Sequence, residues 1–264
     1  MAYYSEISAG SGLVRSGLES STSAAESVRG RNSDACESNK KSNLKRLKAV
    51  LFDLDGTLID SFKAIQSGYN FALSRLNRDK TLTIDEVKKR VGGGLRESFY
   101  DLVGEKLADS AVVEFRKKYR EVYLRESFLL PGVSAVVRSL AEKQLLLAVI
   151  SNKYGDFSRD LLAEFGLLPY LSAVVGDGDG YPLKPHPAMM AHLLDSFRLS
   201  SDEAVYVGDG PTDIEFCRAA GVQIYAVSTG NFLREELLCH SPDHMIDSLT
   251  ELIPKLEQVS DSFS

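Results

Sequence analysis

The chain has 264 residues, which is enough for one large core or for a core with a smaller inserted domain. Its hydrophobic fraction of 44% and charged fraction of 26% are typical of a soluble globular protein. The net charge of −6 argues against nonspecific binding to nucleic acid or to an anionic membrane, and no apolar run is long enough to cross a bilayer. Three widely spaced cysteines fit a reducing compartment, so we expect a cytoplasmic protein.

Residues 1–46 differ in composition from the rest of the chain. Serine recurs there without a sustained helix or strand period, so the segment buries too little apolar surface to offset the entropy of ordering. We predict a disordered, Ser-rich tail. An organellar transit peptide is the alternative, but transit peptides are poor in acids and this segment contains several: Glu6, Glu19, Glu26, Asp34 and Glu37.

A short apolar run over residues 49–52 predicts the first buried strand, and two carboxylates follow it. Residues i and i+2 of a strand face the same side, so Asp53 and Asp55 converge at its carboxyl end. In an open α/β sheet, this end is where ligands bind. The next residues are Gly56 and Thr57. Two oxygen-rich side chains beside a glycine turn suit a hard divalent cation, most naturally Mg²⁺, together with a phosphate.

Residues 61–129 predict an all-helical insert. Asp60 and Ser61 are N-cap candidates for a helix that continues to Leu76, and residues 83–86 have the spacing of a capping box. Helical periodicity continues from Phe99 to Tyr119, and no run of strands is apparent between residues 60 and 128. A block of this length is sufficient for a small domain.

After residue 130, apolar strands alternate with helices along most of the remaining chain. Strands are expected over residues 145–150, 173–175, 204–207 and 222–227, and helices over 157–165, 187–197 and 214–220. Continuous apolar strands that alternate with helices favour a doubly wound parallel sheet. We therefore predict an α/β, Rossmann-like core made of residues 47–60 and 130–258.

Three further polar segments follow predicted strands of this core. Ser151 and Asn152 can donate hydrogen bonds to phosphate oxygens, although the same pair can also cap a helix. Lys184 lies in a proline-framed loop and offers a point charge to a phosphoryl group. Asp209 and Asp213 flank a Gly-Pro step. Together with the two carboxylates after the first strand, they point to a shared metal site.

The four segments resemble motifs I to IV of the haloacid dehalogenase superfamily in order and separation. Motif I is the Asp-x-Asp-Gly-Thr run that begins at Asp53, and motif IV is the Gly-Asp-x-x-x-Asp run around Asp209. The resemblance covers residues 48–256 and is closest to the phosphoglycolate phosphatase-like branch, in which a helical cap lies between motifs I and II. It implies a Mg²⁺-dependent phosphatase that acts on a small phosphate ester. Dehalogenases lack an acid at the position of Asp55, which favours the phosphatase.

The resemblance also implies a role for each motif residue. Asp53 would be the nucleophile that forms an aspartyl-phosphate, and Asp55 would be the general acid and base. Mg²⁺ would contact the Asp53 carboxylate, the Asp55 backbone carbonyl and Asp209, with Asp213 as a further or outer ligand. The expected phosphate-binding residues are Gly56, Thr57, Ser151, Asn152 and Lys184.

The glycine-rich segment of the insert lies where relatives place a specificity loop. Gly92 to Gly94 allow close backbone approach to a ligand, and we expect Gly93 and Arg96 to determine specificity. If Arg96 meets a carboxylate, 2-phosphoglycolate is the first candidate substrate. A flexible turn with a solvated arginine is an equal alternative.

Other functions share these residues. A mutase of the β-phosphoglucomutase type would use the same catalytic set, but such relatives carry a cap histidine soon after motif I, and residues 62–66 contain none. Hydrolysis of pyrophosphate or of nucleoside monophosphates remains open. A non-catalytic binding protein is a further alternative, against which the intact catalytic residues argue. The sequence indicates no oligomeric state.

Overall fold

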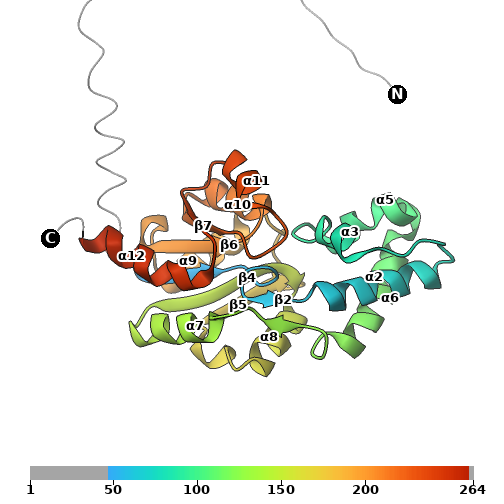
Figure 1. The fold of residues 1–264 in the computed structure, drawn as a ribbon, viewed down its shortest axis with the longest axis horizontal. Helices are drawn as coiled ribbons and strands as arrows, with labels where there is room; N and C mark the ends of the chain where they lie inside the picture. The colour runs from blue at the N-terminus through green and yellow to red at the C-terminus, as the bar shows by residue number, and fades with distance from the viewer. Residues whose placement is uncertain (1–46, 262–264) are drawn as a thin grey trace, which may run out of the picture. The chain divides into compact units, whose positions relative to one another are not determined.

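The structure of the protein is a computed structural model that describes residues 47–261, so the predicted disordered tail lies outside the described residues. Its central strands are β1 (Ala49–Phe52), β4 (Leu146–Tyr154), β5 (Ala173–Asp177), β6 (Ala204–Gly208), β7 (Gln223–Val227) and β8 (His244–Ile246). They form one sheet in the order β5-β4-β1-β6-β7-β8, and every pairing is parallel (Figure 1). The predicted α/β fold with a parallel sheet is confirmed.

Helices cover both faces of this sheet, as the doubly wound prediction requires. Alternate residues of β1 enter two separate cores, Val50 and Phe52 on one face and Ala49 and Leu51 on the other. The first core includes residues of α7 (Val133–Glu142), α8 (Gly155–Glu164) and α12 (Leu252–Asp261). The second includes residues of α9 (Ala188–Phe197), α10 (Pro211–Ala220) and α11 (Arg234–Cys239). Strand β1 is therefore buried on both sides, which explains its wholly apolar sequence.

The region between β1 and α7 is helical, as predicted. Its helices are α2 (Phe62–Arg75), α3 (Ile84–Lys88), α4 (Leu95–Ser98), α5 (Tyr100–Val103) and α6 (Glu105–Val122), and we call α2 to α6 the helical insert. Figure 1 shows α2, α3, α5 and α6 grouped beside the sheet. The capping box that the sequence predicts at Thr83 is present, since its hydroxyl accepts from Glu86 N and Glu86 accepts from Thr83 N.

Two short strands at the ends of the insert were not predicted. β2 (Ile59–Asp60) and β3 (Phe128–Leu129) pair antiparallel where the chain leaves the core and returns to it. Each strand has only two residues, which is too short to leave a periodic signal. This β2–β3 pair joins the segment that leads into the insert to the segment that leads out of it. The pair therefore fixes where the insert attaches to the core.

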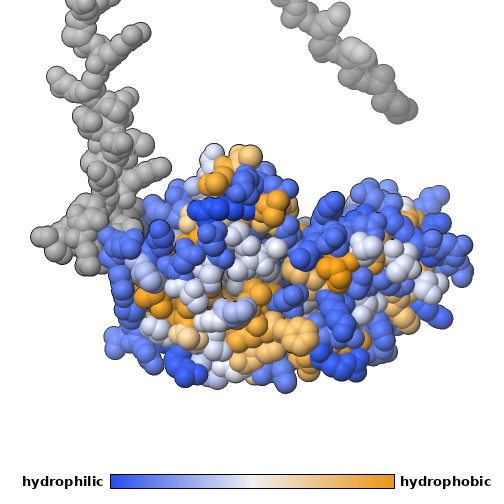
Figure 2. Space-filling view, viewed as in Figure 1, coloured by the Kyte–Doolittle hydropathy of each residue, from blue (hydrophilic) through white to orange (hydrophobic). Residues whose placement is uncertain are grey.

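The face of the described region that Figure 2 draws is mostly polar. On the face drawn in Figure 2, hydrophilic residues predominate over the helical insert, and apolar residues gather mainly over the region of α7 and α8. Within residues 47–261, no helix is both long and apolar enough to span a bilayer.

Candidate active site

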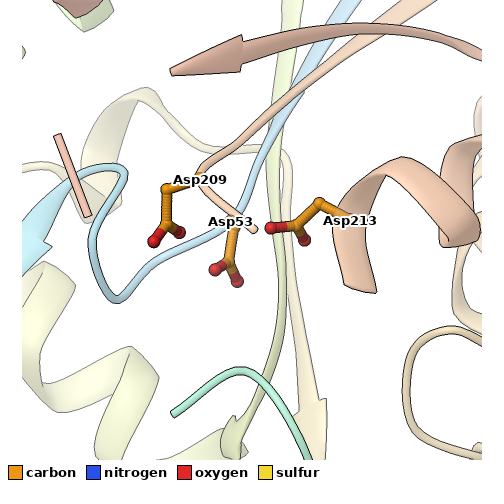
Figure 3. Close-up of side chains that lie close together, drawn as sticks. All are labelled: Asp53, Asp209 and Asp213. Carbon is orange, nitrogen blue, oxygen red and sulfur yellow. The ribbon is translucent and has the colours of Figure 1, made fainter. Parts of the chain in front are cut away.

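Three carboxylates converge at the carboxyl ends of two neighbouring strands. Asp53 follows β1, Asp209 follows β6, and Asp213 lies in the first turn of α10 (Figure 3). Strands β1 and β6 run parallel in register, Phe52 opposite Val207, so their following residues must meet. One carboxylate oxygen from each of the three lies within 4.8 Å of the others, and all three residues are buried.

The turn after β1 brings the backbone close to these carboxylates. Gly56 has a φ of 86°, a left-handed conformation that favours glycine, and a Cβ at this position would collide with the Asp209 carboxylate. Thr57 Oγ1 donates to Asp209 Oδ1 at 3.2 Å. The Gly-Thr pair of the sequence motif therefore shapes the acidic cluster as well as the predicted phosphate-binding turn.

Burial makes this cluster costly without a cation. It raises the pKa of Asp53 to about 6, against the opposing effect of Lys184, and it raises the pKa of Asp209 well above its usual range, with Asp53 and Asp213 adding to the shift. A divalent cation would offset this repulsion, and carboxylate oxygens are the ligands that Mg²⁺ prefers. Three buried carboxylates from two segments of the chain therefore fit a bound divalent cation.

Lys184 bridges two members of the cluster. Its Nζ lies 2.7 Å from Asp53 Oδ1 and 2.7 Å from Asp213 Oδ1, and it donates to the Tyr206 hydroxyl at 3.0 Å. Although burial alone lowers the pKa of Lys184, the Asp213 and Asp53 carboxylates raise it above its usual value, so the ammonium stays charged. The proline-framed loop places this lysine in the acidic cluster, where it orients the carboxylates.

Asp55 faces a different set of partners. Its Oδ2 lies 2.7 Å from Lys153 Nζ, and its Oδ1 accepts a hydrogen bond from Ser61 Oγ. The Asp55 side chain is not part of the three-carboxylate cluster. Ser61 precedes α2 as its N-cap residue but makes no side-chain cap bond, because its hydroxyl is used by Asp55.

The predicted phosphate-binding pair in β4 has other roles in the structure. Asn152 Nδ2 donates to Lys184 O at 2.9 Å and to Gly92 O at 3.0 Å, and its Oδ1 accepts from Lys184 N at 2.7 Å. Both ends of this amide are thus engaged in holding the Lys184 loop and the glycine-rich loop of the insert. Ser151 is buried, and its Oγ accepts from Lys153 N at 3.2 Å.

Two cavities adjoin Asp53 and Asp55 on either side of the glycine-rich loop. The larger cavity encloses about 700 Å³, counted to its open mouth, and reaches into the helical insert. The smaller cavity encloses about 420 Å³ and borders Asp209 and Asp213. Asp53, Asp55 and Lys184 line both cavities.

The two predicted specificity residues differ in placement. Gly93 lines the larger cavity. Arg96 lines neither cavity, since its Nε pairs with Asp109 Oδ1 at 2.6 Å on the exposed side of the insert. Arg90, six residues earlier, lines the larger cavity instead. The direction of a side chain within such a short irregular segment depends on where each helix begins, and α4 begins only at Leu95.

Sequence reasoning missed Lys153 and Tyr206. Lys153 is two residues after Ser151 in β4, so the same i, i+2 rule that joined Asp53 to Asp55 could have found it. Tyr206 lies inside the apolar strand β6 and carries no local signal, because a buried tyrosine in a strand is ordinarily a core residue.

Comparisons with known proteins agree with this geometry. Residues 50–227 match the family described as haloacid dehalogenase-like hydrolase. A phosphoglycolate phosphatase of Rhodospirillum rubrum is 35% identical over 196 residues, which cover 69% of this chain and 80% of that protein. The phosphoglycolate phosphatase of Nitrosococcus oceani is 28% identical over 229 residues, covering 82% of this chain and 100% of the relative. The crystal structure of a predicted phosphatase from Clostridium acetobutylicum is similar with a TM-score of 0.74 at 27% identity, covering 80% of this chain and 99% of that one.

Proposed function

Because the chain belongs to the haloacid dehalogenase-like hydrolases, whose phosphatases it resembles at every motif, we propose that it is a Mg²⁺-dependent phosphatase of small phosphate monoesters. The observation that carries this proposal is the buried cluster of Asp53, Asp209 and Asp213, bridged by Lys184, beside a second acid, Asp55. Clusters of this kind are expensive to bury, so a catalytic use is the simplest reason for keeping them.

The proposed reaction has two steps at phosphorus. An Asp53 carboxylate oxygen forms a bond to phosphorus while the bond to the leaving oxygen breaks, and Asp55 gives its proton to that oxygen. Asp55 then takes a proton from water, whose oxygen attacks phosphorus and returns Asp53 as a carboxylate with release of orthophosphate. Mg²⁺, held by Asp53, Asp209, Asp213 and the Asp55 carbonyl, would offset the repulsion between the carboxylate and the phosphate.

The surrounding groups support these steps without adding chemistry of their own. Lys184 keeps Asp53 oriented through its 2.7 Å contact and supplies positive charge beside the reacting oxygens. Lys153 and Ser61 hold the Asp55 carboxyl in place. The turn at Gly56 and Thr57 and the hydroxyl of Ser151 remain the proposed donors to phosphate oxygens.

The simplest candidate substrate is 2-phosphoglycolate. The support for it is the name of the relatives and the presence of cationic side chains in the larger cavity, where an anionic leaving group would lie. Residues 61–129 contain no histidine, which supports water as the phosphoryl acceptor in place of a sugar hydroxyl.

The test is Mg²⁺-dependent phosphate release from a panel that includes 2-phosphoglycolate, pyrophosphate, nucleoside monophosphates, sugar phosphates and p-nitrophenyl phosphate. We expect Asp53→Asn and EDTA each to abolish turnover, by at least about a thousandfold for the variant, because the amide is not a nucleophile. Asp101→Asn is the matched control, since Asp101 is exposed on α5 and lines neither cavity. Turnover that survives in Asp53→Asn would contradict the aspartyl-phosphate mechanism.

A further inference from the structure

The larger cavity lies on the leaving-group side of the proposed reaction. Asp55, the proposed donor to the leaving oxygen, lines both cavities, but Lys153, which pairs with its carboxylate at 2.7 Å, lines only the larger one. Asp209 and Asp213 border only the smaller cavity. A leaving alcohol that takes its proton from Asp55 therefore extends toward the helical insert. The lining of the larger cavity should match that alcohol.

Every carboxylate that lines the larger cavity has an ion-pair partner, but one of the cations that line it has none among the described residues. Three carboxylates line it, and each has a cation at 2.7 Å: Lys184 at Asp53, Lys153 at Asp55 and Arg116 at Asp177. The fourth cation is Arg90, which has no carboxylate within ion-pair distance anywhere in residues 47–261. Its Nη1 donates only to the backbone carbonyl of Glu86, at 2.8 Å. Arg90 is thus the surplus positive charge of the cavity.

Apart from Ser151, Asn152 and the glycines, the rest of the wall is apolar and largely aromatic. Rings from both parts of the fold form a continuous surface: Phe115 lies 5.2 Å from Tyr69 and 5.4 Å from Tyr119 between ring centroids, and Tyr119 lies 5.1 Å from Phe157. Tyr69, Phe115 and Tyr119 belong to the insert, and Phe157 belongs to α8 of the core. Leu95 and Ile65 complete this wall. Glycolate alone has almost no apolar surface to place against it.

We propose that the larger cavity binds a leaving alcohol with a flat apolar body and a carboxylate, and that Arg90 pairs with this carboxylate. The inference rests on the proposed phosphatase function and deepens it, since 2-phosphoglycolate becomes the smallest member of the substrate class. The aromatic wall contacts the body, and the surplus charge of Arg90 selects the anion.

The test uses four esters of primary alcohols, so that leaving-group reactivity is similar throughout: ethyl phosphate, 2-phosphoglycolate, benzyl phosphate and 4-carboxybenzyl phosphate. For the wild type we expect the highest kcat/KM with 4-carboxybenzyl phosphate, about tenfold above benzyl phosphate and above 2-phosphoglycolate. In Arg90→Gln the ratio of kcat/KM for 4-carboxybenzyl phosphate to kcat/KM for benzyl phosphate should fall about tenfold. The fall should come from a higher KM for the carboxybenzyl ester, with little change in kcat. Arg90→Lys, which keeps the positive charge, should retain part of the preference for the carboxybenzyl ester.

Arg78→Gln is the matched control. Arg78 is another arginine of the insert that donates to a backbone carbonyl, Val103 O at 3.2 Å, and it lines neither cavity. We expect it to leave all four values of kcat/KM unchanged. Arg96→Gln tests the alternative that Arg96, and not Arg90, pairs with the carboxylate of the substrate.

Several results would overturn the proposal. One is a wild type that prefers 2-phosphoglycolate to 4-carboxybenzyl phosphate. Another is an Arg90→Gln variant in which kcat/KM falls equally for the benzyl and the carboxybenzyl ester. A third is a fall in kcat/KM that is selective for the carboxybenzyl ester in Arg96→Gln but not in Arg90→Gln. These outcomes all leave a working phosphatase, so they differ from failure of the proposed function itself, in which the folded wild type with Mg²⁺ turns over none of the esters.

Discussion

The hydroxyl of Tyr206 contacts two groups that the proposed reaction uses, Lys184 and Asp213, and one backbone carbonyl. It accepts from Lys184 Nζ at 3.0 Å and lies within donor distance of Ile150 O, at 3.0 Å, and of Asp213 Oδ1, at 3.2 Å. Burial, aided by the Asp213 and Asp53 carboxylates, raises the pKa of Tyr206 well above 10, so the hydroxyl keeps its proton. We regard Tyr206 as a positioning residue that fixes Lys184 relative to the acidic cluster.

Replacing this hydroxyl should affect catalysis more than stability. We expect Tyr206→Phe to lower kcat about tenfold and to raise the Mg²⁺ concentration for half-maximal activity several-fold, because a hydrogen bond to a charged group contributes about 1.5–3 kcal/mol. Phosphate-release kinetics across a Mg²⁺ titration measures both effects.

The control is Tyr225→Phe. Tyr225 is equally buried in the adjacent strand β7, but its hydroxyl has no hydrogen-bond partner among the described residues. We expect this variant to keep the wild-type kcat and Mg²⁺ dependence. If both variants lose activity to the same extent, the Tyr206 hydroxyl has no positioning role.

At the scale of elements, α2 and α6 pack closely because α2 has a glycine at their contact. A Cβ on Gly68 would lie 2.7 Å from two ring carbons of Phe115, closer than carbon atoms pack. The ring packs edge-on to Tyr69 and is stacked on Tyr119, so it can move away only by giving up these contacts. Gly68 therefore sets the position of the aromatic wall.

Gly68→Ala should destabilise the protein despite the better helix propensity of alanine. The propensity gain of about 1 kcal/mol is smaller than the overpacking cost of about 1–3 kcal/mol. In a Phe115→Leu background the smaller side chain leaves room, so we expect the same Gly68→Ala change to stabilise. Urea unfolding of the four proteins in this double-mutant cycle measures the coupling, and additive effects would contradict the proposed contact.

What the sequence could predict at this scale follows from how local each signal is. The apolar strands and the polar residues at their ends are contiguous runs, so the parallel sheet and the meeting of Asp53 with Asp209 could be predicted. The pairing of Arg96 with Asp109, and the exposure of Arg90 to the cavity, depend on the packing of short helices and leave no such signal. Strand β8 was missed because its three residues begin with His244 and so do not form a continuous apolar run.

At the scale of the whole molecule, metal binding and folding are coupled. A ligand that binds only the folded state at about 100 times its Kd stabilises it by about 2.7 kcal/mol. We therefore expect saturating Mg²⁺ at pH 7.5 to raise the Tm by about 5–10 °C for a chain of this size. Asp209→Asn should lose most of this increment and Asp101→Asn should keep it. A Tm that does not respond to Mg²⁺ in the wild type would argue against the metal site.

The Mg²⁺-dependent rise in Tm should become smaller at acidic pH. Burial raises the pKa of Asp53 from 3.8 to about 6, so the folded, metal-free protein holds an extra proton between about pH 4 and 6. The contribution of this proton on Asp53 to the stability of the folded state is complete below pH 4 and is lost as the pH rises through 6. Mg²⁺ requires the deprotonated form, so the Mg²⁺-dependent rise in Tm should shrink as the pH falls below 6.

The central position of β1 in the sheet has a consequence for synthesis on the ribosome. Its neighbours β4 and β6 both come later in the chain, and Asp53 is 131 residues from Lys184, while Thr57 is 152 residues from Asp209. A growing chain carries Asp53, the proposed nucleophile, long before it carries the cation and the carboxylates that surround it. Nascent chains that end before β6 therefore lack the complete site, and phosphate ester hydrolysis begins only after β6 and the start of α10 have been made.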